Sequence, residues 1–276
     1  MKTRFDPVDI SIMKRLSFYT LASLIAGMFV IPLVLVASMS LRQLGLPPPQ
    51  ILEWFPVMPA WSNYGRIFQI IPLGQYVLNS LIVAGLAVPL TILVASWAGF
   101  AMAQLPAGVR YLLLGFAVLL RMVPVSTFWL PRFILFTKLG MIDSFLALLA
   151  PVWLGSSPFF VLLFYWSFRR MPQAQFDSAR LDGMGALRIW AQIGMPNARA
   201  ALMAVSVLTF AQYWSDFINP LLYLKSEQRY TLAVGLRVLQ QMDATNWPLL
   251  MAAVMVLVAP IIALFLAVQH AFFDAE

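Results

Sequence analysis

The chain has 276 residues, of which 62% are hydrophobic and only 11% are charged, and its mean hydropathy is +0.84. A soluble domain is usually ~45–50% apolar and ~25% charged, so this composition excludes a water-soluble globular enzyme, a disordered chain and a nucleic-acid-binding module. The sequence therefore predicts an all-α, polytopic membrane protein. In such a protein the formal net charge of +7 matters through the positions of Lys and Arg, which indicate membrane topology.

Six apolar stretches are long enough to cross a membrane, because a spanning helix needs ~20 apolar residues and all its backbone groups must be paired internally. The predicted spans cover residues of about 16–41, 77–103, 111–136, 146–168, 200–224 and 246–269. The first two carry no charge, whereas the third contains Arg121 and Arg132 and the fifth contains Asp216. Residues 1–276 are expected to form a single transmembrane domain.

Basic residues are divided unevenly between the two sides of this predicted bundle. Ten lie before the first span or in the second-to-third and fourth-to-fifth connections: Lys2, Arg4, Lys14, Arg15, Arg110, Arg169, Arg170, Arg180, Arg188 and Arg199. Six lie in the other connections: Arg42, Arg66, Lys138, Lys225, Arg229 and Arg237. Because basic residues accumulate in cytoplasmic loops, we expect a multi-pass protein of the cell inner (plasma) membrane with both termini in the cytoplasm.

The connection between the fourth and fifth spans, residues 169–199, predicts two short helices joined by a glycine turn. Pro172 suits the first turn of a helix, where its missing N–H is not needed. Gly183 can adopt the left-handed conformation that ends a helix, and Pro196 ends the second helix before the fifth span.

This connection resembles the EAA loop of ABC-importer permeases. Asp177-Ser178-Ala179 stands at the family's Glu-Ala-Ala triplet, Leu181-Asp182-Gly183 at its glycine, and Ile193-Gly194-Met195-Pro196 at its closing run. Further stretches follow the family's order: Asn79-Ser80-Leu81, Leu139-Gly140-Met141 with Asp143-Ser144, Tyr213 to Leu221, and Thr231 to Leu236. The Leu-Asp-Gly version is similar to the carbohydrate-uptake, maltose-type subfamily, although Asp177 and Ser178 replace the usual Glu and Ala.

The resemblance implies a type I ABC importer permease fold with six transmembrane helices and a cytoplasmic coupling loop. It implies that this loop docks on a separate ATPase subunit through Phe176, Asp177, Ser178, Ala179, Arg180, Asp182 and Gly183. Phe176 and Ala179 would supply the buried apolar contact, and Asp177, Arg180 and Asp182 the charges at its rim. The alternative is a plain cytoplasmic connector held by salt bridges.

Charges inside the membrane are candidate functional sites, because burying one costs at least ~2.5 kcal/mol. Asp216 is hypothesised to pair with Arg121 or Arg132 near the translocation path; the alternatives are a position at the outer mouth and an ion pair that only fixes helix packing. Tyr213, Trp214 and Asn219 are candidates for solute contact, since rings stack on sugar C–H faces and amides bond hydroxyls. Tyr and Trp also gather at membrane interfaces without any ligand.

By resemblance, the chain is a permease subunit that forms half of the translocation path of an ATP-driven importer for a sugar or oligosaccharide. The implied partners are a second homologous permease subunit, a dimer of ATPase subunits and an extracytoplasmic solute-binding protein. The same importer for a glycerol phosphate, a polyol or another solute is the alternative. A secondary transporter would need coupling-ion carboxylates and inverted repeats, which the sequence does not offer.

Catalysis and cofactor binding are not expected on this chain. The sequence contains no Gly-Lys-Ser/Thr element of a phosphate-binding loop, so ATP and Mg are assigned to the partner ATPase. It contains no Cys and one His, His270, which excludes Cys-type and His-based metal sites.

Overall fold

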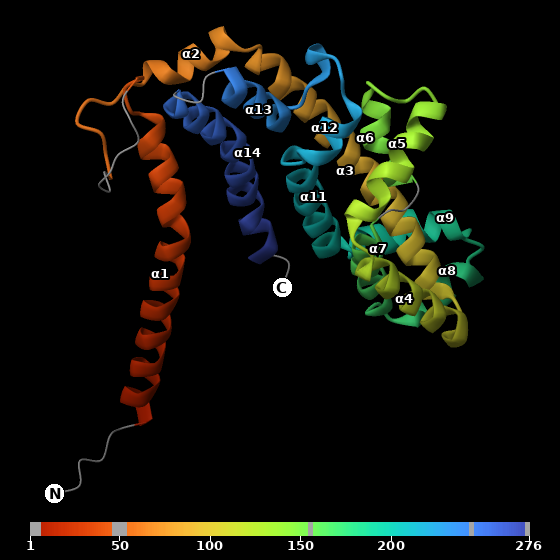
Figure 1. Cartoon of the computed structure of the whole chain (residues 1–276). Coiled ribbons are helices and arrows are strands. Elements are labelled where there is room, and N and C mark those ends of the chain that lie inside the picture. The colour runs from red at the N-terminus through yellow and green to blue at the C-terminus, as the bar shows by residue number, and fades with distance from the viewer. Residues whose placement is uncertain (1–6, 46–53, 154–156, 243–245, 274–276) are drawn as a thin grey trace, which may run out of the picture. The chain divides into compact units, whose positions relative to one another are not determined.

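The computed structural model describes residues 7–45, 54–153, 157–242 and 246–273, and within these ranges it contains helices and no strand (Figure 1). Lys2 and Arg4, which the topology prediction used, lie outside the described residues. Contacts divide the chain into two compact units, Met1–Ile70 with Leu239–Val256, and Ile71–Val238 with Leu257–Glu276. The single-domain organisation stays a prediction.

In the first unit, the long helix α1 (Pro7–Ser40) is followed by the short helix α2 (Ser62–Ile70). The side-chain amide of Asn63 donates to the carbonyl oxygens of Ser40 and Arg42, at 2.9 and 2.8 Å. The hydroxyls of Ser40 and Tyr64 are 2.8 Å apart. These contacts bind the start of α2 to the end of α1.

In the second unit, the central helix is α3 (Leu73–Gln104), which packs against α6 (Phe145–Trp153), α7 (Pro158–Arg169) and α11 (Arg199–Trp214). The backbones of α3 and α7 approach closely at Gly99, where a Cβ atom would lie 2.8 Å from the backbone nitrogen of Tyr165. The helices that follow α12 (Ile218–Tyr223) are α13 (Leu232–Met242) and α14 (Trp247–Phe273).

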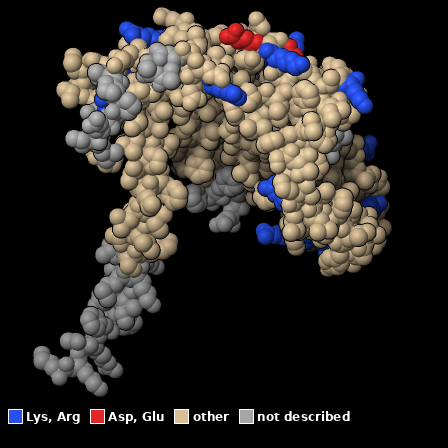
Figure 2. Space-filling view, viewed as in Figure 1, with Lys and Arg blue, Asp and Glu red and all other residues tan. Residues whose placement is uncertain are grey.

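Within the part of the chain that the structure describes, three helices are long and apolar enough to cross a membrane, over Ser17–Ser40, Leu73–Gln104 and Trp247–Gln269. Three further pairs of helices bend at short breaks, so the described residues supply up to six spans if each bent pair counts as one. Most of the surface seen in Figure 2 is neither acidic nor basic, which is what a chain facing hydrocarbon requires.

The predicted third span is broken rather than continuous. Helix α4 (Ala107–Met122) ends before Pro124, a 3₁₀ turn covers Val125–Phe128, and α5 (Trp129–Lys138) leaves at 88° to α4. The reason is local: proline has no N–H and its ring clashes with the preceding helical turn, and Val123 before it is extended, with ψ of 123°. Arg121 therefore lies in the last turn of α4, and Arg132 lies beyond the bend.

The predicted fifth span also ends early. Helix α11 stops at Trp214, and Ser215, Asp216 and Phe217 precede the separate helix α12. Asp216 accepts a hydrogen bond from the backbone N–H of Asn219, and Pro220 sits in the first turn of α12, where its missing N–H is not needed. The expectation that Asp216 lies on a continuous helix was wrong, because an aspartate and a proline at this spacing start a new helix.

The predicted fourth span consists of α6 and α7, which bend by 42° across residues outside the described ranges. The 169–199 loop agrees with the prediction of two helical segments joined by a glycine turn. Helix α8 (Gln173–Leu181) is followed by Asp182 and by Gly183, whose φ is +77°. The second segment consists of α9 (Ala186–Ile189), a π-helical turn over Trp190–Gly194 and α10 (Met195–Asn197).

Candidate functional site

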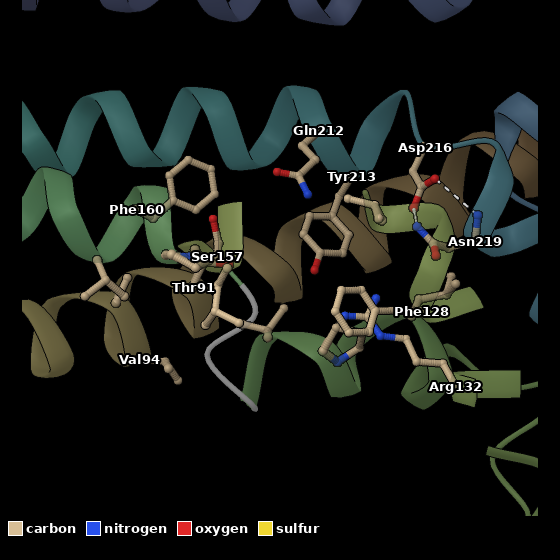
Figure 3. Close-up of a pocket in the computed structure, with 18 of the residues that line it drawn as sticks. Thr91, Val94, Phe128, Arg132, Ser157, Phe160, Gln212, Tyr213, Asp216 and Asn219 are labelled. Atoms are coloured by element: carbon tan, nitrogen blue, oxygen red, sulfur yellow. Dashed lines mark hydrogen bonds between the residues drawn. The ribbon is translucent and has the colours of Figure 1, made fainter. Parts of the chain in front are cut away.

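A cavity of about 190 Å³ lies within the second unit, among helices α3, α4, α5, α6, α7, α11 and α12 (Figure 3). Its polar and charged lining residues are Thr91, Arg121, Arg132, Ser157, Gln212, Tyr213, Asp216, Asn219 and Tyr223. Four of the five residues predicted to contact solute or line a path therefore share one cavity, although three of them come from the α11–α12 region and Arg121 comes from α4. The break in α4–α5 and the break in α11–α12 both open onto this cavity.

The carboxylate of Asp216 is held by Asn219, as Figure 3 shows. It accepts hydrogen bonds from the Asn219 backbone N–H at 3.3 Å and from the side-chain amide at 2.7 Å. Among the described residues, no ion pair within 4.0 Å joins Asp216 to Arg121 or Arg132. The predicted Asp216–Arg pair is thus not formed, because the start of α12 supplies the donors that the carboxylate needs.

The two arginines of the cavity lie against aromatic rings. The guanidinium carbon of Arg121 is 5.9 Å from the ring centre of Phe159, and that of Arg132 is 5.6 Å from the ring centre of Phe128. Such contacts are attractive, since the ring face is electron-rich. They satisfy the face of the guanidinium but not its in-plane N–H groups.

Two buried polar atoms of the cavity residues have no hydrogen-bond partner among the described residues. They are the side-chain oxygen of Asn219 and the hydroxyl of Tyr223. A buried polar group without a partner costs ~1–3 kcal/mol, so such atoms point to water or a polar ligand at this place.

Trp214 departs from the prediction that it contacts solute. Its side chain is only 1% exposed and is not part of the cavity wall. The indole N–H donates to the carbonyl oxygen of Leu257 at 2.7 Å, and the ring stacks on Phe210. Trp214 therefore fastens α11 to α14, because its size and single donor suit a packed position.

Helix α8 packs on the rest of the second unit through Phe176 and Ala179, the two residues that were expected to supply the apolar contact with the ATPase. Phe176 and Ala179 are 2% and 4% exposed. The ring of Phe176 packs edge-on against Phe100 of α3 at 5.9 Å, and Phe100 packs against Phe168 of α7 at 5.4 Å. The prediction of a partner contact through Phe176 and Ala179 is corrected: their apolar face is already buried within the chain.

The other face of α8 is open. Leu181 is 88% exposed, and Asp177, Ser178, Arg180, Asp182 and Gly183 are exposed as well. Arg180 forms an ion pair with Asp177 at 2.9 Å and donates to the side-chain oxygen of Gln104 at the end of α3. The charges of α8 thus join the helix to α3, while the apolar side chain of Leu181 has nothing to pack on.

Residues 225–232, together with the side chains of Asn79 and Asp143 that hold them, form a cluster that we call the 225–232 clamp. The carboxylate of Asp143 accepts from the backbone N–H groups of Lys225 and Ser226, both at 2.9 Å, and from the Ser226 hydroxyl. On the other side, the amide of Asn79 donates to the carbonyl oxygens of Gln228 and Tyr230, both at 2.9 Å. The segment is therefore held from two directions.

Asp143 lies between α5 and α6, outside the apolar helices, and it also pairs with Arg229 at 3.3 Å. The hydrogen bonds from Ser226 and Lys225, with the nearby Arg229, lower the pKa of the Asp143 carboxyl from 3.8 to about 2. Each of these contacts stabilises the ionised form, so Asp143 is a charged structural anchor at neutral pH.

The comparison with known families decides what kind of protein carries this arrangement. Residues 87–273, about two thirds of the chain, match the family described as binding-protein-dependent transport system inner membrane component. The chain belongs to this family. The matched range includes the whole cavity lining, the 169–199 loop, Asp143 and residues 225–232, whereas Asn79 precedes it.

Relatives of this inner membrane component include permease proteins of transport systems. It is 28% identical to the sulfoquinovosyl glycerol transport system permease protein SmoH of Agrobacterium fabrum, over 90% of this chain and 86% of that protein. It is also 28% identical to the arabinooligosaccharides transport system permease protein AraQ of Bacillus subtilis, over 80% of this chain and 78% of that one. The sn-glycerol-3-phosphate transport system permease protein UgpE of Yersinia enterocolitica is 27% identical, over 77% and 78%.

Solved structures agree on the fold. A chain of a bacterial ABC transporter involved in the import of the acidic polysaccharide alginate matches with a TM-score of 0.75 at 18% identity, over 98% of this chain and 100% of that one. A chain from the alginate transporter in complex with an alginate pentasaccharide-bound periplasmic protein matches with a TM-score of 0.65 at 14% identity, over 94% and 95%. The inner membrane component therefore has the fold of an ABC importer permease, as the sequence predicted.

Sequence reasoning missed several residues of the cavity and of α8. Tyr223 follows Asn219 by four residues, a helical spacing that places both on one side of α12 and could have revealed it. Leu181, besides its place in the Leu-Asp-Gly motif, was a candidate for one apolar face with Phe176 and Ala179. The structure instead exposes it on the other side of α8, as expected for a residue five positions after Phe176 on a helix.

Proposed function

We propose that this permease subunit couples an ATPase subunit, which binds ATP and Mg, to the opening and closing of a path for a sugar-type solute. In this proposal the chain hydrolyses nothing and carries no cofactor. Its partners are a second homologous permease, a pair of ATPase subunits and an extracytoplasmic solute-binding protein. Both termini lie in the cytoplasm, on the side with the larger number of basic residues.

This proposal rests mainly on the contrast between the buried and the exposed face of α8. One face is locked to α3 and α7 through Phe176, and the opposite face offers Leu181, 88% exposed, beside Asp177 and Asp182. An exposed leucine beside polar groups can supply the apolar centre of a contact, because water is excluded from that centre when a partner binds. Leu181 replaces Phe176 as the proposed apolar contact with the ATPase.

In this proposal, helix α3 transmits the movement of α8 to the cavity. This helix contacts α8 through Phe100 near its C-terminal end and contributes Thr91 to the cavity about two and a half turns earlier. A packed helix moves as a rigid element, so a displacement of α8 by the ATPase would be transmitted to the cavity wall.

The solute is proposed to be a sugar or a related polyhydroxylated molecule. The support is that the relatives' names refer to arabinooligosaccharides, sulfoquinovosyl glycerol and glycerol phosphate, all rich in hydroxyl groups. The cavity offers the matching chemistry, because the Asn219 side-chain oxygen and the Tyr223 hydroxyl have no partner among the described residues. Glycerol phosphate and polyols remain the alternative solutes within the same type of importer.

The coupling surface is tested with Leu181→Asp in the tagged full-length chain. A buried unpaired carboxylate opposes docking, so we expect at least tenfold less ATPase subunit to co-purify from native membranes and a similar loss of ATP hydrolysis. Leu139→Asp is the matched control, since Leu139 is also exposed, at 61%, at the end of α5 outside the loop. Failure of the wild-type chain to bring down any ATPase subunit contradicts the proposed function.

A further inference from the structure

The charge balance of the cavity wall is positive. Arg121 and Arg132 face one acidic residue, Asp216, and the carboxylate of Asp216 is occupied by two hydrogen bonds from Asn219. Among the described residues neither guanidinium has a carboxylate within 4.0 Å. Arg121 is exposed and Arg132 is half-buried at the cavity, and an arginine at membrane depth is costly unless water or a negative charge reaches it.

The donors of these arginines remain open within the described residues. Each guanidinium rests against one phenylalanine ring, Phe159 or Phe128, at 5.9 and 5.6 Å. A ring occupies the face of the guanidinium and leaves its in-plane N–H groups free to bind a planar or tetrahedral oxyanion through two parallel hydrogen bonds. The aromatic contact therefore positions the donors without using them.

The bend after α4 places both arginines on the wall of one cavity. On a straight helix, eleven residues would separate Arg121 and Arg132 by about 16 Å along the axis. The 88° bend after Met122 instead makes both residues part of the wall of the same cavity. Arg132 and Tyr213, labelled in Figure 3, lie on the same cavity as the Asp216–Asn219 pair.

We propose that the solute carries an oxyanion, a carboxylate, sulfonate or phosphate, which Arg121 and Arg132 bind, while Asn219 and Tyr223 bind its hydroxyl groups. This inference rests on the proposed function and narrows its solute class from sugars and polyols in general to their acidic forms, phosphate esters included. The free oxygen of Asn219 accepts from a solute hydroxyl, and the free hydroxyl of Tyr223 donates to or accepts from another. The apolar and aromatic wall beside them, with Phe128 and Phe160, suits the C–H faces of a sugar ring.

The test uses the whole complex in lipid vesicles, with its solute-binding protein, and matched pairs of neutral and acidic probes: glucose with glucuronate, galactose with galacturonate, and glycerol with sn-glycerol 3-phosphate. We expect the acidic member of a pair to be taken up at least tenfold faster than the neutral member. Arg121→Gln and Arg132→Gln should each reduce the uptake of the acidic probe at least tenfold and leave ATPase co-purification unchanged. Lysine at either position should restore part of the uptake, because the charge remains while the paired geometry is lost.

Arg110→Gln is the matched control. Arg110 also lies against a ring, with its guanidinium carbon 5.3 Å from the ring centre of Tyr111, but it is not part of the cavity wall. Faster uptake of the neutral probes overturns the inference, and so does equal loss of both members of a pair in the glutamine variants, which would assign the arginines to a lipid phosphate or to assembly. The Leu181 experiment tests the proposed function independently of this inference, because it measures association with an ATPase subunit and involves no solute.

Discussion

Asp143 adopts a backbone conformation that few residues tolerate. Its φ is +60°, in the left-handed region that Asn and Asp enter more readily than other residues with side chains. In that conformation its backbone N–H donates to the Tyr223 carbonyl at 2.7 Å while its carboxylate receives the N–H groups of Lys225 and Ser226. One residue thus joins the α5–α6 turn to the segment that follows α12, next to the cavity.

We expect Asp143→Asn to lower the stability of the purified complex by about 1–2 kcal/mol, since asparagine keeps the backbone conformation but loses the charge-assisted hydrogen bonds. The pKa of the Asp143 carboxyl is lowered from 3.8 to about 2, so its contribution is complete above pH 4 and is lost as the pH falls through 2. Thermal unfolding measured against pH should therefore show a gap between the two proteins that closes in acid. Asp182→Asn, at an exposed acid on α8, should show no gap; an equal gap there would contradict the assignment.

Helices α3 and α7 pack closely because Gly99 of α3 has no side chain at their contact. Gly99 lets the two backbones meet, because a Cβ atom there would lie 2.8 Å from the Tyr165 nitrogen and 2.9 Å from the Val161 carbonyl oxygen. Backbone atoms cannot move aside as a flexible side chain can. The close approach also brings Phe164 and Phe168 of α7 into the cluster that holds Phe100 and Phe176.

We expect Gly99→Ala to destabilise the protein by about 1–3 kcal/mol, because overpacking forces the two helices apart. Gly85→Ala on the same helix is the control: a Cβ at Gly85 meets nothing within 4 Å, and alanine favours a helix by ~1 kcal/mol over glycine. Thermal unfolding of the two variants should move in opposite directions. A Gly99→Ala protein as stable as wild type would show that the α3–α7 contact is looser than the structure has it.

At the scale of the second unit, α3 connects the exposed surface of α8 to the cavity. The aromatic rings of Phe176, Phe100 and Phe168 form the joint between them. Leu181 and Phe176 therefore have separable roles, although they are five residues apart on one helix: Leu181 is proposed to bind the ATPase, and Phe176 to transmit its movement.

We expect Phe176→Ala to retain co-purification of the ATPase subunit but to lower solute uptake at least tenfold more than ATP hydrolysis. Removal of the ring leaves a cavity where α8 meets α3, so docking persists while the transmission of movement is weakened. The measurement is the ratio of solute imported to ATP hydrolysed in vesicles. Parallel loss of both quantities would assign Phe176 to docking or folding instead.

The sequence by itself determined the class of the protein and the order of its parts. These signals are local or compositional: apolar stretches of span length, a loop helix followed by glycine, and the motifs around Asn79, Asp143 and Asp216. In hydrocarbon the backbone groups of an apolar stretch must be paired within it, so the stretch forms a helix. Such signals predicted the fold and the break at Gly183, and four of the five residues that they singled out for the path line the cavity.

Only the tertiary structure decided which face of each element is used. The bends at Pro124 and before α12, the burial of Phe176 and Trp214, and the exposure of Leu181 depend on what packs on the other side of a helix, which residue spacing does not encode. The same reason explains why Asp216 pairs with Asn219 and leaves Arg121 and Arg132 without an acid among the described residues. A helical period places side chains around an axis, but neighbours distant in sequence determine whether each one faces a core, a cavity or a partner.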